Sequence, residues 1–175
     1  MYIPLLITSW YLYVSVKKSD SSFAPSFSES LQVYINLLIT ELLYYLADSC
    51  IYTYINFSFI NLIMVFIAQD IYFYFMHYLL HNHLYLFHIK HHTKYGPFYA
   101  WYSTIPDHIF LNLFSLGVPF YLFNNSSLVF VLLVILQIYT SINGHTDNSP
   151  HSIHHKNVKK RLGSIYLVDR LLGTY

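Results

Sequence analysis

Cysteine and charged residues are scarce in this sequence of 175 residues. Its one cysteine, Cys50, excludes an intrachain disulfide and leaves no set of thiolates for an iron–sulfur cluster or a structural zinc site. Charged residues make up 10% of the chain and apolar residues 55%, which is too hydrophobic for a soluble domain of this size. The net charge of +1, without a basic stripe, argues against a nucleic-acid partner. The composition therefore predicts an integral membrane protein with a single domain.

The first 30 residues differ from the rest of the chain. An apolar, aromatic run from Met1 to Val16 is shorter than the ~20 residues that span a bilayer. It lacks the basic start and the cleavage site of a removed signal peptide, so we expect an interfacial anchor or an uncleaved signal-like segment. The serine-rich stretch from Ser19 to Ser30 is predicted to be a loop. We therefore divide the chain into an N-terminal segment with its loop, 1–30, and a membrane domain, 31–175.

Four apolar runs in the membrane domain predict an all-α fold with two transmembrane helical hairpins. These runs are Leu31–Tyr54, Ile55–Met76, Ile109–Phe123 and Leu128–Ile142. The first pair is interrupted by Asp48, Ser49 and Cys50, and a turn at Asn124 to Ser127 separates the second pair. Glu41 lies inside the first run, where it is either a functional group or a residue that faces water near a helix end.

Two hairpins return the chain to the side on which it began, so the segments after the second and fourth runs meet at one membrane face. Seven of the nine Lys and Arg residues lie in these segments: Lys90, Lys94, Lys156, Lys159, Lys160, Arg161 and Arg170. By the positive-inside rule this face is cytoplasmic. Most of the histidines lie in or beside the same segments, which predicts a helical, histidine-rich cap on the cytosolic face.

The chain has eleven histidines, and most of them follow helical spacing. His77 and His81 are four residues apart and project from one face of a helix. Two runs of the form H-x-x-H-H each place three imidazoles within an arc of about 100°. These trios are His88, His91 and His92, and His151, His154 and His155. Each trio could therefore offer three ligands to one metal ion.

Nine spaced histidines, the eight just named and His145, suffice for two metal ions with open positions, so we predict a dinuclear site. Imidazole suits zinc, copper, nickel and iron, and the spacing does not choose among them. A lone histidine on an apolar segment is more often a hydrogen-bonded core residue than a ligand. We expect this bland role for His83 and His108, which fit no spacing.

Several motifs follow one another between Asp70 and Tyr175. They are D-x-x-x-Y-x-x-H-x-x-x-H from Asp70, FHIKHH from Phe87, HHTKYGPF from His91, NGH from Asn143, HSIHHKN from His151 and DRLLGTY from Asp169. In this order they resemble the fatty acid hydroxylase (sterol desaturase) superfamily. Tyr78 stands where members of that superfamily usually have an arginine, and Ile105-Pro106 stands in place of a His-Pro pair, so the resemblance indicates no subfamily.

The resemblance implies an integral membrane di-iron oxygenase that acts on a lipid, usually in the endoplasmic reticulum. It would use O2 and take electrons from a separate cytochrome b5 or NAD(P)H-dependent reductase. Insertion into an unactivated C–H bond requires oxygen activated at two ferrous ions, and neutral imidazoles can carry both. The implied iron ligands are His77, His81, His88, His91, His92, His145, His151, His154 and His155.

Further residues are assigned around these ligands. Carboxylates are expected to accept the second ring N–H of a ligand, and the candidates are Asp70, Asp107, Asp147 and Asp169. For Asp169, an ion pair with a nearby Lys or Arg is the alternative. Aromatic candidates for a lipid channel are Tyr74, Tyr85, Phe98 and Trp101, with a place in the core or an interfacial belt as their alternative.

Some alternatives stay open from the sequence. The substrate is a sterol, fatty acyl, sphingolipid or alkylglycerol lipid, and the reaction is hydroxylation or desaturation. The basic cluster of Lys156, Lys159, Lys160 and Arg161 either attracts an anionic partner or headgroup, or only orients the protein. The alternative to an enzyme is a truncated, non-catalytic membrane protein that binds metal, which the short chain favours.

Overall fold

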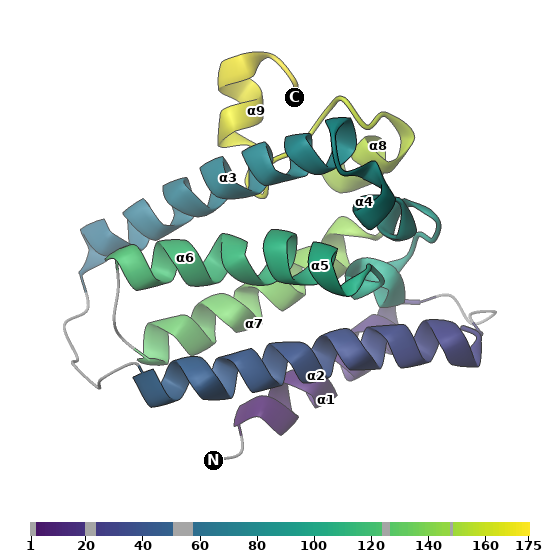
Figure 1. Cartoon of the computed structure of the whole chain (residues 1–175), viewed down its shortest axis with the longest axis horizontal. Helices are drawn as coiled ribbons and strands as arrows, with labels where there is room; N and C mark the ends of the chain where they lie inside the picture. The colour runs from purple at the N-terminus through teal and green to yellow at the C-terminus, as the bar shows by residue number, and fades with distance from the viewer. Residues whose placement is uncertain (1–2, 20–23, 51–57, 124–126, 148) are drawn as a thin grey trace.

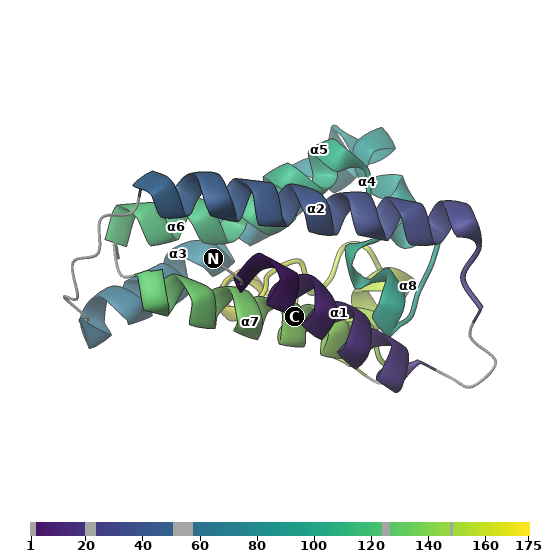
Figure 2. The same ribbon diagram turned by 90° about the horizontal axis from the view of Figure 1, so that it is seen from below.

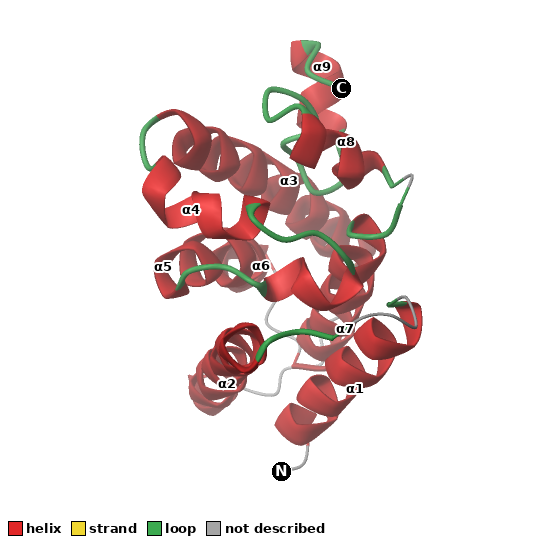
Figure 3. Ribbon diagram, turned by 90° about the vertical axis from the view of Figure 1, so that its right-hand side faces the viewer, coloured by secondary structure: helices red, strands yellow, loops and turns green. Residues whose placement is uncertain are grey.

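The structure is a computed structural model that describes residues 3–19, 24–50, 58–123, 127–147 and 149–175. These residues form helices joined by loops, with no strand among them (Figure 3), which confirms the all-α prediction. In chain order the elements are α1 (Ile3–Lys18), α2 (Phe27–Cys50), α3 (Phe59–Asn82), α4 (Tyr85–His92), η1 (Pro97–Trp101), α5 (Ile105–Asp107), η2 (His108–Leu113), α6 (Phe114–Phe123), α7 (Ser127–Gly144), α8 (Pro150–Lys156) and α9 (Leu167–Leu172).

Helix α2 begins earlier than the sequence predicts. Its start lies inside the predicted loop because Ser26 and Glu29 form a capping box. The Ser26 hydroxyl accepts the Glu29 N–H at 3.3 Å, and the Glu29 carboxylate accepts the Ser26 N–H at 2.8 Å. The predicted interruption at Asp48, Ser49 and Cys50 is instead helical, because these are the last three residues of α2. Neither Pro nor Gly stands there to stop a helix.

Helix α3 carries His77 and His81 in its last two turns. It begins after Ser58, whose hydroxyl accepts the Asn61 N–H. Its 24 residues correspond to about 36 Å, enough for the ~30 Å hydrocarbon core of a bilayer. Among the described residues, α3 is the one helix that is long and apolar enough to cross a membrane. Its first turns expose Phe59, Ile60 and Ile63, as a lipid-facing surface would.

The second predicted hairpin corresponds to α5, η2 and α6 followed by α7. Residues 105–123 are helical throughout, with the wider π-helical turns of η2 at His108–Leu113. Such turns insert an extra residue and occur often at functional sites. Here they come directly after Asp107 and contain His108, both of which are buried.

Helices α2, α3, α6 and α7 extend along the long axis of the molecule, and α4 and α8 lie together at one end (Figure 1). Seen from below, α1 lies beside α7 (Figure 2). The short helix η1 is hydrogen-bonded to both α1 and α2. Tyr11 of α1 donates to the Phe98 carbonyl at 2.9 Å, and Asn36 of α2 donates to the Trp101 carbonyl at 2.8 Å. These buried contacts fix the segment that follows the histidines of α4.

Candidate metal centre

Four parts of the chain bring nine histidines together at the end of the bundle where α4 and α8 lie. They divide into two groups, and within each group one ring nitrogen from every histidine lies within 4.8 Å of the others. The five-histidine group consists of His77, His81, His88, His92 and His154. The four-histidine group consists of His91, His145, His151 and His155. These are the nine histidines that the sequence analysis selected.

The prediction that each trio offers three ligands to one point is wrong. In α4, His88 and His92 belong to the five-histidine group, whereas His91 belongs to the other. In α8, His154 is separated in the same way from His151 and His155. Residues four apart differ by about 40° around a helix, but the third member extends the arc to about 100°. That arc is wide enough for a helix lying between two sites to supply both.

Hydrogen bonds at Nδ1 set the tautomers of several rings. Nδ1 of His77 donates to the Leu162 carbonyl at 2.8 Å, Nδ1 of His154 to the Lys160 carbonyl at 2.9 Å, and Nδ1 of His145 to the Ser141 carbonyl at 2.8 Å. A carbonyl only accepts, so Nδ1 carries the proton in each ring. The Nε2 atom of each neutral ring therefore has a free lone pair that points into its group.

The contact between the rings of His77 and His88 then has no hydrogen between its two nitrogens. Nε2 of His77 lies 3.0 Å from Nε2 of His88, and His88 directs its Nδ1 to the Asp107 carboxyl at 3.0 Å. With both protons on Nδ1, two bare lone pairs face each other, and neutral rings in these tautomers cannot hydrogen-bond. A cation bound by both nitrogens removes this conflict.

A proton is a poor candidate for that cation. Burial, with repulsion from neighbouring imidazoles, lowers the pKa of His92 to about 3 and that of His155 to about 2. Burial is also the main cause that lowers the pKa of His154 to about 4. Burial, with repulsion from neighbouring imidazoles, also lowers the pKa of His88, so this ring is neutral and donates its Nδ1–H to the Asp107 carboxylate. The rings are thus neutral at neutral pH, the form that binds metal.

Distances between nitrogens fit a metal with more than four ligands. Two nitrogens held at about 2.1 Å from one ion lie about 3.0 Å apart at a right angle and about 3.4 Å apart at a tetrahedral angle. In the five-histidine group the Nε2 atoms of His81 and His154 are 3.0 Å apart, and those of His88 and His92 are 3.1 Å apart. Five imidazoles also exceed the four ligands of structural zinc. The five-histidine group therefore fits iron better than zinc, whereas the Nε2 separations of 3.3 Å in the four-histidine group are also close to the tetrahedral value.

Comparison with known families identifies the chain. The model of the fatty acid hydroxylase family matches residues 62–174, more than half of the sequence and all nine grouped histidines. The chain belongs to this family. The fatty acid hydroxylase family is part of the sterol desaturase superfamily, and membership implies an oxygen-dependent oxidoreductase that acts on lipids. No curated protein and no solved structure matches the chain.

In this family member the four candidate carboxylates have different surroundings. Asp107 contacts a grouped histidine, with both oxygens 3.0–3.1 Å from Nδ1 of His88. Asp147 is exposed. Asp70 and Asp169 are fully buried, but they accept hydrogen bonds from the segment 162–168 rather than from a ring. Direct support of a histidine by Asp70 or Asp169 is thus a wrong prediction, and so is the alternative ion pair of Asp169.

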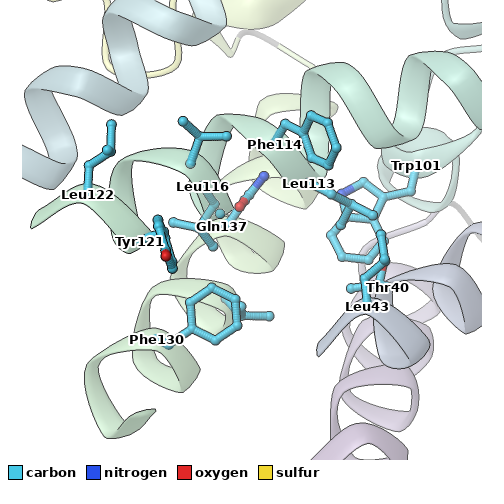
Figure 4. A pocket seen from close by; sticks show the side chains of 13 residues that line it. Thr40, Leu43, Trp101, Leu113, Phe114, Leu116, Tyr121, Leu122, Phe130 and Gln137 are labelled. Atoms are coloured by element: carbon cyan, nitrogen blue, oxygen red, sulfur yellow. The ribbon is translucent and has the colours of Figure 1, made fainter. Parts of the chain in front are cut away.

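Two cavities lie beside the centre. The smaller, of about 90 Å³, is lined by members of both histidine groups and by the polar residues Gln69, Asn112 and Gln137. The larger, of about 330 Å³, is mostly apolar and lies between α2, α6 and α7 (Figure 4). Gln137 lines both cavities and donates to the Asn112 carbonyl at 2.7 Å. It therefore marks the boundary between the apolar cavity and the histidines.

Of the aromatic residues predicted to line a lipid channel, Trp101 borders the larger cavity. Its Nε1 is buried and finds no hydrogen-bond partner among the described residues. Phe98 is packed in the main core, and Tyr74 packs with Leu162 and Val168, so both take the alternative place in the core. Aromatic character alone does not distinguish these places.

Three further residues were left open by the sequence. His108 is buried with Nε2 at 2.9 Å from the Thr40 hydroxyl, as a hydrogen-bonded core residue should be. His83 is exposed at the end of α3, so its expected core role is wrong. The Glu41 carboxylate accepts a hydrogen bond from the Thr8 hydroxyl and joins α1 to α2.

Sequence reasoning missed Asn112 and Gln137, which separate the two cavities. Gln137 is a polar residue inside the apolar run 128–142, and that exception could have drawn attention to it. The carbonyl acceptors at Leu162, Lys160 and Ser141 left no such signal, because every residue has a carbonyl.

Proposed function

We propose that this chain is a membrane-bound di-iron oxygenase that hydroxylates or desaturates a lipid. One observation carries the proposal: inside a set of five imidazoles, the Nε2 atoms of His77 and His88 lie 3.0 Å apart while each ring directs its Nδ1 to an acceptor. A second set of four imidazoles lies beside the first, because α4 and α8 supply both. The five-histidine group would hold one iron and the four-histidine group the other.

Two irons held by these histidines would supply the activation of O2 that attack on a C–H bond of a lipid requires. In hydroxylation one oxygen atom enters the C–H bond and the other leaves as water, with two electrons and two protons supplied from outside. In desaturation two hydrogens leave the lipid and both oxygen atoms become water. The chain contributes nine oriented imidazoles, and Asp107 holds the tautomer of His88.

A lipid substrate is supported by the apolar cavity and its boundary. An alkyl chain suits the lining of Leu113, Leu116, Val118 and Phe130, and 330 Å³ lies at the lower end of the range for small-molecule pockets. Gln137 stands between this cavity and the histidines. The unpartnered Nε1–H of Trp101 could donate to an oxygen of the lipid.

The membrane arrangement and the partners are part of the same proposal. Two hairpins, α2 with α3 and α6 with α7, would cross or enter the bilayer and leave both histidine groups at the cytoplasmic face, most naturally in the endoplasmic reticulum. The order of the helices in Figure 1 supports this, because α3 and α7 both end beside α4 and α8. The exposed Lys156, Lys159 and Lys160 next to α8 suit an acidic electron donor such as cytochrome b5 or a reductase.

The test is expression in a host that lacks such an activity. Wild-type protein should contain close to two irons and produce a lipid with one added oxygen or one added double bond, dependent on O2. His81→Ala should lose iron and product. His83→Ala is its matched control, because His83 is exposed and belongs to neither group. Folded, iron-loaded protein that leaves sterol and acyl-lipid profiles unchanged in the presence of a reductase would refute the enzymatic function.

A further inference from the structure

The segment after α8 is held by two buried carboxylates. Asp70 of α3 accepts the N–H groups of Ile165, Tyr166 and Val168 at 2.8–3.2 Å. Asp169 of α9 accepts the N–H groups of Leu162 and Gly163 at 2.9 and 2.7 Å. Neither carboxylate is exposed. Five backbone N–H groups thus surround two carboxylates, an arrangement that stabilises their charge without a cationic side chain.

Gly163 lies where the two carboxylates meet. A Cβ atom at this position would lie 2.7 Å from an oxygen of Asp70 and 2.8 Å from an oxygen of Asp169. These contacts are too short for any side chain, so glycine is required for the segment to enter between the acids. The neighbouring Arg161 and Tyr166 have positive φ angles of 58° and 63°, a conformation that costs free energy in residues other than glycine. The segment is held in this shape by its hydrogen bonds.

The same segment provides the acceptors for two grouped histidines. The Leu162 carbonyl accepts from Nδ1 of His77, and the Lys160 carbonyl accepts from Nδ1 of His154. Both histidines belong to the five-histidine group. In the four-histidine group, by contrast, Nδ1 of His145 donates to Ser141 within its own helical turn. The two groups therefore differ in their dependence on the C-terminal segment.

We propose that Asp70, Asp169 and Gly163 form a clamp that positions the Leu162 and Lys160 carbonyls and thereby sets the metal affinity of the five-histidine group alone. The inference rests on the proposed function, since it assumes that both groups bind metal. Asp70 and Asp169 are positioning residues that act through the backbone on the tautomer and direction of His77 and His154. Loss of such outer contacts typically weakens metal binding ten- to a hundredfold.

The experiment measures both metal affinities in purified full-length protein. Metal-free protein is titrated anaerobically with Fe(II), and separately with Co(II), in competition with a chelator. In Asp169→Asn an amide N–H group replaces one acceptor, so one of the two ions should bind ten- to a hundredfold more weakly while the other is unchanged. Asp147→Asn is the matched control, because Asp147 is exposed and near the same histidines in sequence.

A milder pair of variants tests the clamp even if Asp169→Asn does not fold. The Thr174 hydroxyl donates to Asp169 at 2.8 Å, so Thr174→Val should weaken one ion by a smaller factor and Thr174→Ser should behave as wild type. Two ions bound as tightly in Asp169→Asn and Thr174→Val as in wild type would overturn the clamp and leave the proposed function intact. Parallel weakening of both ions would also overturn it, because it indicates a general loosening. A wild type that binds no metal would overturn the proposed function itself.

Discussion

Replacement of Asp107 by leucine is the most direct test of how the five-histidine group is organised. Asp107 is buried and places both oxygens 3.0–3.1 Å from Nδ1 of His88. Leucine has the same number and branching of side-chain heavy atoms but accepts no hydrogen bond, so the buried Nδ1–H loses its partner. An unsatisfied buried donor costs about 1–3 kcal/mol. At 1.4 kcal/mol per factor of ten, this corresponds to roughly a 5- to 150-fold weaker site.

This range agrees with the ten- to hundredfold effect typical of outer contacts at metal sites. The assay is competition between metal-free protein and a chelator for Fe(II), with thermal unfolding measured in parallel. We expect one ion of the two to be weakened, because Asp107 contacts a histidine of one group. Asp107→Asn retains an acceptor oxygen and should lose less than a factor of ten. Wild-type affinity for both ions in Asp107→Leu, within threefold, would refute the role of Asp107.

Three further predictions concern the two metal sites, the apolar cavity and the topology. His92→Ala and His155→Ala should each reduce the iron content from about two to about one per chain, because the two residues belong to different groups. The double variant should lose nearly all of its iron, as measured by elemental analysis of purified protein. Gly117 borders the apolar cavity, and a Cβ atom there would meet nothing within 4 Å. Gly117→Leu should therefore fill the cavity and lower lipid turnover at least tenfold with unchanged iron content, whereas Gly117→Ala should be near wild type. Equal turnover of all three proteins would exclude the cavity as the lipid site. Single cysteines at Lys94 and Lys159 in a Cys50→Ser background should both react with an impermeant thiol reagent added from the cytosolic side, and labelling of one from the lumen would contradict a shared face.

Local periodicity was enough to predict the helices that carry the histidines, because i, i+4 spacing fixes which side chains share a helical face. It also selected eight of the nine grouped histidines, whereas His145 has no partner at helical spacing. It could not divide them, since the assignment of His91 to one group and His92 to the other depends on where α3 and the end of α7 lie relative to α4. That placement is a tertiary property.

The supporting contacts were harder to predict for a different reason. Four aspartates fit an outer role equally well in the sequence, and only the approach of α5 to α4 distinguishes Asp107. Asp70 and Asp169 act on backbone N–H groups, which every sequence offers equally. The requirement for glycine at position 163 arises from the meeting of α3 and α9, whose contact between Asp70 and Val168 joins residues 98 positions apart in sequence. Similarly, Tyr74 and Phe98 are as aromatic as Trp101, and only packing separates core from cavity.

In the proposed di-iron protein, each metal ion would also act as a cross-link in a chain that has one cysteine and so no disulfide of its own. An ion that binds both His81 and His154 closes a loop between residues 73 positions apart, and one that binds His91 and His145 closes another of 54. For a disulfide, closing a loop of the first size is worth about 4 kcal/mol through the entropy of the unfolded chain. Because α4 and α8 each touch both ions, release of either ion loosens both loops. Iron starvation of a cell should therefore lower the amount of this protein, through degradation of the unfolded chain, before it leaves a stable but idle pool.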